Sequence, residues 1–468
     1  MKDNHKKLLM RSVAATLVAL SLNGCVLGPD YVRPAVDIPA EFKEARGWKT
    51  AEPRDDKPRG SWWELFGDPA LNVLVEQVEV SNQDVQLALA QYRQAQAAAQ
   101  AARASFFPDI GTSAGVDRSS SKSKISNSFN LGLDASWEPD LWGGIARSVE
   151  AGKASLQSSA ALLGAVRLSA QANLVQDYFQ LRIVDETMAL QSRTVDGYRR
   201  ALQITQNQLA SGIVTRADVA QAQSQLKSAE AQLIDLGVTR AQLEHAIAIL
   251  IGKAPAAFSL DKSTFNARLP EVPGSLPSSL LERRPDIAAA ERRAAAANAE
   301  IGVARAAFYP SFSLGVSGGF QSTRVSDLFD VPSRVWSLGA SLAQTLFDGG
   351  LRKARSAEAI ASYDASVAQY RQTVLGGLQE VEDNLVALRL LADEAVVQAE
   401  AVTAAHEAER LALDQYKAGT VSYSNVIIAQ TASNNAERTA LLLLGRRYSA
   451  SALLVKALGG GWQGIGEK

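Results

Sequence analysis

The chain contains two similar halves. The motif FFPDI at 106–110 opens a Ser/Gly-rich alternating stretch that ends at LWGG (141–144), and the motif FYPSF at 308–312 opens a second stretch that ends at LFDGG (346–350). The second copy follows the first by about 200 positions, far more than the 20 to 50 residues of a solenoid unit. We therefore interpret the chain as the duplication of a whole module of strands and long helices.

Prolines mark the breaks between elements, because a proline inside a helix removes a hydrogen bond and disrupts the helix. Six prolines lie at 29–69 and five at 255–285, whereas none occurs at 140–254 or at 333–468. The predicted segments are a signal peptide, an anchored surface linker, a first repeat, an irregular connector, a second repeat and a tail. Their boundaries are 1–24, 25–69, 70–254, 255–285, 286–458 and 459–468.

The two proline-free segments carry continuous helical patterns. We predict helices at 145–210 and at 351–418, each about 100 Å long at ~1.5 Å per residue. Such lengths are typical of coiled-coil packing or of a spanning tube. Gly212 and Gly419 tolerate the left-handed conformation that ends a helix, and the pattern resumes at Ala217 and Ser424. Each half is therefore predicted to contain a long helical hairpin.

Two short alternating runs precede each long helix. At 129–138, apolar residues alternate with polar ones, which predicts a strand with one apolar and one wet face. The other expected strands are at 110–116, 312–316 and 336–342. Polar loops are expected between the strands of each pair, at 118–126 and 322–334. Strands of about ten residues with aromatic ends are typical of a transmembrane β-barrel.

Four strands cannot close a barrel, and an open edge in lipid leaves backbone N–H and C=O groups unpaired. A barrel of about eight strands is filled with side chains, whereas about twelve strands leave a lumen, so three copies form the smallest pore. We therefore predict an α+β membrane protein. Its expected form is a homotrimer in which a 12-stranded β-barrel, four strands per chain, continues into a 12-helix α-barrel tunnel.

The first residues are typical of a secretory signal, with basic Lys6, Lys7 and Arg11 before an apolar run at 13–22. Cys25 follows this run and is the single cysteine of the chain, which excludes an intrachain disulfide. Its thiol is therefore reactive, incidental or modified.

Several motifs in a fixed order resemble the outer-membrane factor family, the TolC-like ducts of tripartite efflux pumps, and within it the acylated drug-efflux lipoproteins. The motifs are LNGC (22–25), GPDYVRP (28–34), WW (62–63), RRPDI (283–287), AAFYPS (306–311) and LGGGW (458–462). The resemblance implies that Cys25 is acylated and that the chain is a passive trimeric export duct of the bacterial outer membrane, with its tunnel in the periplasm. The implied partners are a periplasmic adaptor protein and an inner-membrane, proton-driven transporter of the resistance-nodulation-division type.

The turns of the two hairpins are the candidate periplasmic aperture. Many relatives carry Asp where this chain has Asn425 and Ile428, whereas Asp218, the repeat partner of Asn425, is acidic. Rings of acidic residues would favour cations and hold the mouth closed. Asp218 is equally consistent with a charge that the helix dipole favours at a helix start. Both interpretations of Asp218 stay open.

No residue pattern suggests catalysis, a cofactor or nucleic-acid binding. The formal charge is −1, and no basic stripe carries interleaved aromatic residues. His5, His245 and His406 lie in no metal-ligand spacing. We expect a transport protein rather than an enzyme; the alternative is a structural periplasmic coiled-coil lipoprotein that tethers the envelope, which would need no barrel.

Two further groups of residues have structural interpretations. Trp62 and Trp63 are expected to pack against the tube rather than to anchor at an interface. A cluster of charged residues at the start of the second repeat is expected to be a solvated helix start with local ion pairs, and the alternative is an adaptor-binding role. Its members are Glu282, Arg283, Arg284, Glu291, Arg292 and Arg293.

Overall fold

The structure is a computed structural model that describes residues 26–36, 42–45, 61–121, 124–263, 267, 269–270 and 284–460. The predictions for the signal peptide, Cys25, His5, Glu282 and Arg283 fall outside these residues. Within the described part of the chain, no helix combines the length and the apolarity needed to cross a membrane.

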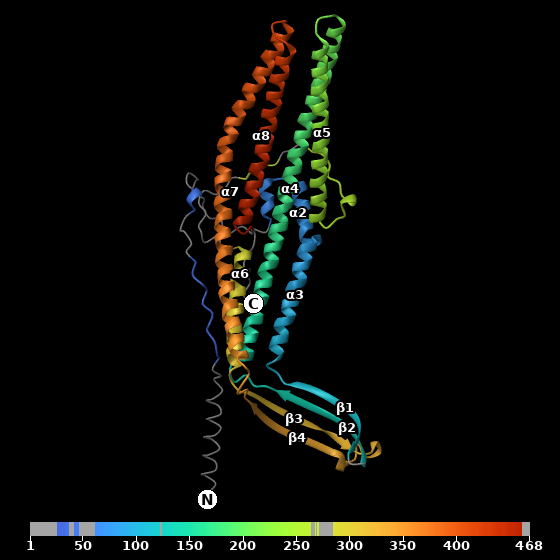
Figure 1. Ribbon diagram of the computed structural model, residues 1–468, viewed down its shortest axis with the longest axis vertical. Helices are drawn as coiled ribbons and strands as arrows, with labels where there is room; N and C mark the ends of the chain where they lie inside the picture. Colours follow the sequence, from blue (N-terminus) through green and yellow to red (C-terminus); the bar gives the residue numbers. More distant parts are fainter. Residues whose placement is uncertain are drawn as a thin grey trace. The chain divides into compact units, whose positions relative to one another are not determined.

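The duplication predicted from the sequence is visible as two runs of elements in the same order (Figure 1). The corresponding helices are equal in length: α3 and α6 have 22 residues each, α4 and α7 have 67 each, and α5 and α8 have 35 each. The first run is α2 (Pro69–Ser81), α3 (Gln83–Ala104), β1 (Asp109–Ser121), β2 (Lys124–Trp137), α4 (Gly144–Ala210) and α5 (Arg216–Leu250). The second run is α6 (Pro285–Ala306), β3 (Ser311–Ser322), β4 (Arg334–Ala343), α7 (Leu351–Lys417) and α8 (Tyr423–Ala457).

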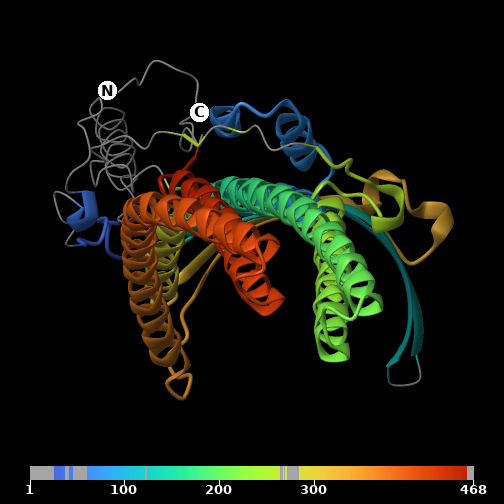
Figure 2. The ribbon, with the colours of Figure 1, turned by 90° about the horizontal axis from the view of Figure 1, so that it is seen from above.

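Each long helix folds back on a shorter partner, α4 with α5 and α7 with α8 (Figures 1 and 2). The turns contain Gly212 with φ 70° and Gly419 with φ 76°, in the left-handed region that a side chain disfavours. Within each hairpin, a glutamine of the long helix donates to a backbone carbonyl of the short one. Gln191 Nε2 donates to the Ala229 carbonyl at 3.0 Å, and Gln398 Nε2 to the Ala436 carbonyl at 2.9 Å. The predicted helical hairpins are confirmed, and they recur in detail.

The four strands form one antiparallel sheet in the order β1-β2-β3-β4. In the register, Leu133 lies opposite Thr112 and Gly318, and Ser136 lies opposite Asp109 and Gly315. Because side chains alternate along every strand, one face of the sheet is apolar and the other is rich in Ser, Gly, Asn and Asp. Exposed apolar side chains on the first face are Ile110, Val116, Leu133, Val316, Trp336, Leu338 and Leu342.

The polar loop predicted at 118–126 is wrong. Strands β1 and β2 continue through most of this segment, with Ser119 opposite Ser126 and Ser120 opposite Ile125. The two serine hydroxyls of the first pair lie 3.3 Å apart. Polarity indicated a loop, but cross-strand pairing extends the hairpin, because Ser and Thr residues can hydrogen-bond across a ladder. The second predicted loop is confirmed, and it contains two short 3-10 turns, Val325–Asp327 and Val331–Ser333.

The described residues divide into two compact units. One unit contains the sheet and consists of 91–160, 289–371 and the described residues before 36. The other consists of the described residues of 36–90, 161–288 and 372–460. Each unit thus combines segments of both repeats.

The core of the second unit is aromatic. Phe66 packs against Phe179, with ring centroids 4.7 Å apart, and Phe179 against Tyr448, with centroids 4.6 Å apart. Trp62 and Trp63 are buried in the same cluster, and Trp62 Nε1 donates to Gln171 Oε1 at 3.2 Å. The expected packing of both tryptophans is confirmed. The segment expected to be a surface linker therefore supplies core residues, each worth about 1.5–3 kcal/mol when fully buried.

In the unit that contains the sheet, the described N-terminal residues run along the helices. Leu27 N–H donates to the Trp142 carbonyl at 3.2 Å, and Arg147 donates from Nε to the Leu27 carbonyl at 3.1 Å and from Nη2 to Asp30 at 2.8 Å. A Cβ on Gly28 would lie 2.5 Å from Gly302 Cα, so only glycine fits this crossing. The chain directly after Cys25 is thereby fixed beside the end of β2.

Candidate functional site: the helical tips and the polar face of the sheet

At the tip of the first hairpin, Asp218 belongs to the cap of α5. Thr215 N–H donates to Asp218 Oδ2 at 2.8 Å, Thr215 Oγ1 donates to the same oxygen at 2.7 Å, and Asp218 N–H donates to Thr215 Oγ1 at 3.3 Å. This reciprocal pattern is a capping box. The hydrogen bonds from the Thr215 side chain and backbone lower the pKa of Asp218. Asp218 is partly exposed, and its carboxylate places a negative charge at the tip.

The tip of the second hairpin is neutral. Asn425 is exposed, and its backbone N–H donates to the Ser422 carbonyl at 3.1 Å. The first turn of α8 contains no acidic residue, and Ile428 is exposed one turn later. The two hairpins of one chain thus present unlike tips, one carboxylate and one amide.

A tyrosine outside the predicted site residues joins the two hairpins near their tips. Tyr416 at the end of α7 donates its hydroxyl to Gln208 Oε1 on α4 at 2.6 Å, and its ring lies 5.3 Å from that of Tyr423 on α8. Burial, together with Tyr416 and Tyr198, raises the pKa of Tyr423 to about 12. Tyr416 occupies the repeat position of Leu209, so a comparison of the two copies would have shown that a hydroxyl replaces an apolar residue.

Amides and hydroxyls continue this contact along the hairpins. Gln225 Nε2 of α5 donates to the Tyr198 hydroxyl at 3.1 Å and to Thr431 Oγ1 of α8 at 3.2 Å. Thr194 Oγ1 donates to Asn434 Oδ1 at 3.1 Å. These side chains line a cavity of about 80 Å³, large enough for water. The hairpins therefore meet through neutral hydrogen bonds that can exchange with water.

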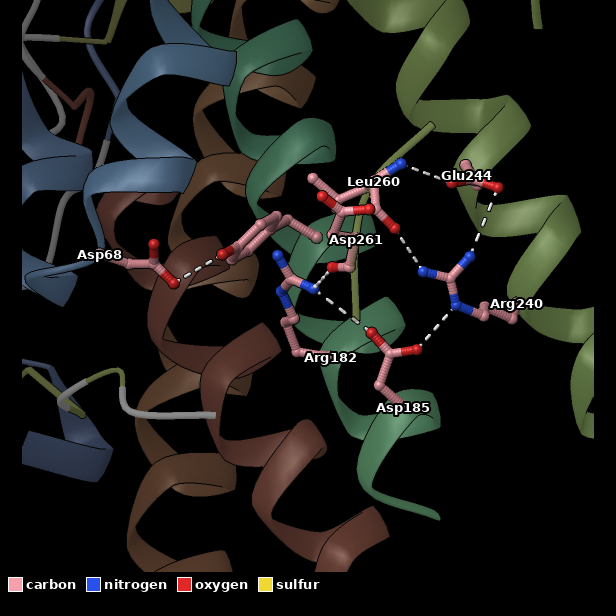
Figure 3. A network of polar contacts seen from close by, with 8 residues as sticks. Asp68, Arg182, Asp185, Arg240, Glu244, Leu260 and Asp261 are labelled. Carbon is pink, nitrogen blue, oxygen red and sulfur yellow. Dashed lines mark hydrogen bonds and ion pairs between the residues drawn. The ribbon is translucent and has the colours of Figure 1, made fainter. Parts of the chain in front are cut away.

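Farther from the tips, a charged network holds the first hairpin to the connector (Figure 3). Asp185 on α4 accepts from Arg240 Nε on α5 at 2.7 Å and from Arg182 Nη1 at 3.3 Å. The two arginines also donate to the connector, Arg240 to the Leu260 carbonyl at 2.5 Å and Arg182 to the Asp261 carbonyl at 2.7 Å. Burial lowers the pKa of Arg240, but the hydrogen bond and charge of Asp185 outweigh it, so the pKa is raised. Such a satisfied network fixes position rather than supplying chemistry.

The polar face of the sheet supplies hydroxyls in ordered pairs. Ser313 and Ser341 have their Oγ atoms 2.7 Å apart, and Ser317 and Ser337 have theirs 2.8 Å apart. Asp134 lies on the same face, between Leu133 and Ala135 of the apolar face. This face therefore offers hydroxyls and backbone groups that water can hydrogen-bond, with sparse charge.

The expected solvated cluster at the start of the second repeat is wrong for two residues. Arg284 is 5% exposed and donates from Nη2 to Asp286 Oδ2 at 2.7 Å and from Nη1 to Glu380 Oε2 at 2.7 Å. Glu291 is also buried, and its carboxylate accepts from the Tyr31 hydroxyl at 2.8 Å. The predicted local ion pairs are present, Arg284 with Asp286 and Arg292 with Glu291. The two further partners, Glu380 and Tyr31, lie 96 and 260 positions away, so local spacing did not indicate the burial.

Histidines and acidic residues form no metal site among the residues that the structure describes. His406 Nε2 lies 2.6 Å from Glu437 Oε1, a contact between α7 and α8 at a half-exposed position.

Known proteins share this sequence and architecture. The family model described as "Outer membrane efflux protein" matches residues 74–253 and 276–460. The pyoverdine export outer membrane protein OpmQ of Pseudomonas aeruginosa is 30% identical over 97% of this chain and 98% of its own length. The cation efflux system protein CusC of Escherichia coli is 28% identical over 95% and 98%. The solved structure of the outer-membrane channel OprN superposes with a TM-score of 0.87 at 30% identity and covers 94% of this chain and 100% of that one. The fold class predicted from the sequence, long helical hairpins continuing from a four-stranded sheet, is thereby confirmed.

Proposed function

The chain belongs to the outer membrane efflux protein family and is an efflux channel of the outer membrane, and from this premise we propose that it acts as the passive trimeric duct of a tripartite pump. The observation that carries the proposal is the two-faced sheet, whose apolar side is exposed and whose edges are open. An open edge in hydrocarbon is unfavourable by several kcal/mol per unpaired group. Closure by three copies gives about twelve strands and a wet lumen.

We propose that the barrel lumen is the polar face and that α4, α5, α7 and α8 of three copies surround the continuing tunnel. Helices α4 and α7 each run unbroken for 67 residues to a tip. The tips would dock a periplasmic adaptor. An inner-membrane, proton-driven transporter would deliver the exported molecules to it. The chain itself then needs no catalytic group, since transport is driven by the partner.

The exported substance is proposed only as a class, small molecules that the transporter delivers. The relatives are named for pyoverdine and for cations, two chemically different cargoes. The hydroxyl-lined face of this chain offers weak contacts to many solutes. If the transporter rather than the duct selects the exported molecule, relatives can serve different cargoes and the duct wall needs only weak contacts.

Anchoring through an acylated Cys25 is part of the proposal. Several acyl chains bind a membrane firmly, whereas one binds marginally. The contact of Leu27 with Trp142 and Arg147 holds the chain two residues later beside the end of β2, where lipid is expected. Cys25→Ala should abolish incorporation of radioactive palmitate, and labelling that persists would exclude this site.

A planar bilayer measurement tests the channel itself. The purified full-length protein should give long-lived steps of ion conductance, whereas an envelope tether of coiled-coil type would give none. Parallel samples should show a trimer on gels without boiling and a monomer after boiling. A protein that inserts in neither assay would contradict the proposed function.

The aperture interpretation of Asp218 has its own test. If three Asp218 carboxylates converge on the mouth, Asp218→Ala should raise conductance and weaken cation preference. Thr215→Val is the matched control, because it removes the hydroxyl of the capping box and leaves the carboxylate. Equal effects of the two substitutions would identify Asp218 as a helix cap alone. Asn425→Asp should strengthen cation preference, since it adds a carboxylate at the second tip.

A further inference from the structure

The two edges of the sheet are the free surfaces of the unit that contains it. Strand β1 pairs only with β2, and β4 pairs only with β3, so both outer edges are open in the described chain (Figure 1). The edges belong to different repeats, because β1 opens the first hairpin and β4 closes the second. Directions alternate through the sheet, so β4 of one copy and β1 of another would meet antiparallel, as β2 and β3 do.

The junction of β2 with β3 already joins a first-repeat hairpin to a second-repeat hairpin. Beyond the strands, the Trp142 ring stacks on that of Tyr309, with centroids 5.0 Å apart and an interplanar angle of 28°. Trp142 Nε1 also donates to the Pro310 carbonyl at 2.7 Å. One complete contact between repeats is therefore present within the chain, with a strand ladder and an aromatic pair.

The partners for a second such contact are present but separated. Phe347 occupies the repeat position of Trp142, and Phe107 that of Tyr309. Phe347 is 90% exposed and Phe107 is 66% exposed. Three strand spacings, about 14 Å, lie between the two edges of the sheet, so these rings cannot stack within one chain.

Both hairpins hold the residues before their first strand near the end of their second strand, through side chains at different repeat positions. In the first hairpin, Trp137 Nε1 donates to the Phe106 carbonyl at 3.0 Å. In the second, Gln344 Nε2 donates to the Phe308 carbonyl at 3.1 Å. In both, the residues before the first strand are tied to the end of the second strand by a side-chain N–H. The geometry of one junction can therefore be transferred to the other.

Closure of the proposed barrel brings β4 of each copy beside β1 of the next. We propose that these strands pair in the register of the β2–β3 junction, and that Phe347 stacks on Phe107 of the next copy. This inference rests on the proposed trimeric channel and assigns its subunit interface. Alignment of the repeats at LWGG and LFDGG, and at their two prolines, transfers the pair Ser136–Gly315 to Ser341–Ser113. The neighbouring pair becomes Leu342 opposite Thr112 of the next copy.

The transferred register agrees with the chemistry of both edges. Ser341 and Ser113 lie on the polar face of their strands. In the proposed register, Leu338 would lie opposite Val116 of the next copy on the apolar face. A slip by one residue would turn serines toward lipid and leucines toward the lumen. Slips by two or four residues would keep the faces matched but would separate Phe347 from Phe107 along the edge, so the proposed ring contact is specific to this register. Phe347 has no N–H to replace the indole of Trp142, so the ring contact and the ladder form the whole junction.

Disulfide crosslinking of the full-length protein in its membrane tests the register. Directly opposite residues have Cα atoms about 4.5–5.5 Å apart, within the range that a disulfide spans. Ser113→Cys with Ser341→Cys should give covalent trimers on non-reducing gels after mild oxidation, and reduction should remove them. The matched control is Ser113→Cys with Ser337→Cys, which uses the same edges and the same face but is displaced by four residues, about 13 Å. Each single substitution controls for Cys25.

The aromatic contact has a second test that needs no crosslink. Phe107→Ala and Phe347→Ala should each lower the temperature at which the trimer dissociates in detergent. Together they should lower it by little more than the larger single effect, because the partner ring is already missing. Additive shifts, or a covalent trimer from the displaced cysteine pair, would overturn the proposed junction.

The two proposals fail differently. A conducting, heat-modifiable trimer that gives no Ser113–Ser341 crosslink would overturn this register and leave the channel in place. A chain that neither conducts nor forms a trimer would contradict the channel itself.

Discussion

Asp177 lies on α4 with most of its side chain withdrawn from water, and this burial raises its pKa to about 6. When the pKa of an acid is higher in the folded protein than in the unfolded chain, the folded protein loses stability as pH rises from about 4 to about 6. The reason is that the carboxylate then ionises at a poorly hydrated site. Asp177→Asn removes this charge. We expect the variant to match the parent near pH 4 and to exceed its stability above pH 6 by at most about 3 kcal/mol.

Loss of helical circular dichroism on heating, measured at pH 4 and pH 7.5, checks this expectation. Asp235→Asn serves as the control, since Asp235 is exposed on α5. A stability gain for Asp177→Asn that is the same at both pH values would point to packing instead of charge.

At the scale of elements, one glycine sets the spacing of β2 and β3. A Cβ on Gly319 would lie 2.3 Å from the Leu131 carbonyl oxygen and 2.7 Å from Gly132 Cα, both backbone atoms that cannot move aside. Gly315 lies on the same face of β3, where an added Cβ meets nothing within 4 Å. Gly319→Ala should therefore destabilise the sheet by about 1–3 kcal/mol, as overpacking does, whereas Gly315→Ala should not. The yield of heat-modifiable trimer measures the difference, and equal yields would contradict it.

At the scale of the whole molecule, the two faces of the sheet have different solvents in the proposed channel. Leu133 is 62% exposed on the apolar face, and Ser136 lies three residues later on the polar face. Leu133→Arg should reduce membrane-inserted trimer, at a cost of about 2–4 kcal/mol if the residue lies at the bilayer midplane. Ser136→Arg should assemble and alter conductance instead. Equal losses of trimer would show that the faces are assigned wrongly.

Local sequence patterns were sufficient to predict the helices, turns and strands of this protein. The proline-free segments, the glycines at 212 and 419 and the alternation at 129–138 predicted the helices, their turns and the two-faced strands. Helix periodicity and strand alternation depend on residues a few positions apart, so both can be recognised from the sequence without a structure. The duplication, seen as repeated motifs, reappears as helices of equal length.

Contacts between distant residues were decided only in three dimensions. Arg284 looked like a solvated helix start, yet Glu380 and the Ala457 carbonyl, which lie 96 and 173 positions away, bury it. Segment 118–126 looked like a loop, yet β1 and β2 pair through most of it. The hydrogen bond from Tyr416 to Gln208 crosses 208 positions. Periodicity indicates which face of an element is apolar, whereas the partner that covers that face or accepts a hydrogen bond depends on how the whole chain packs.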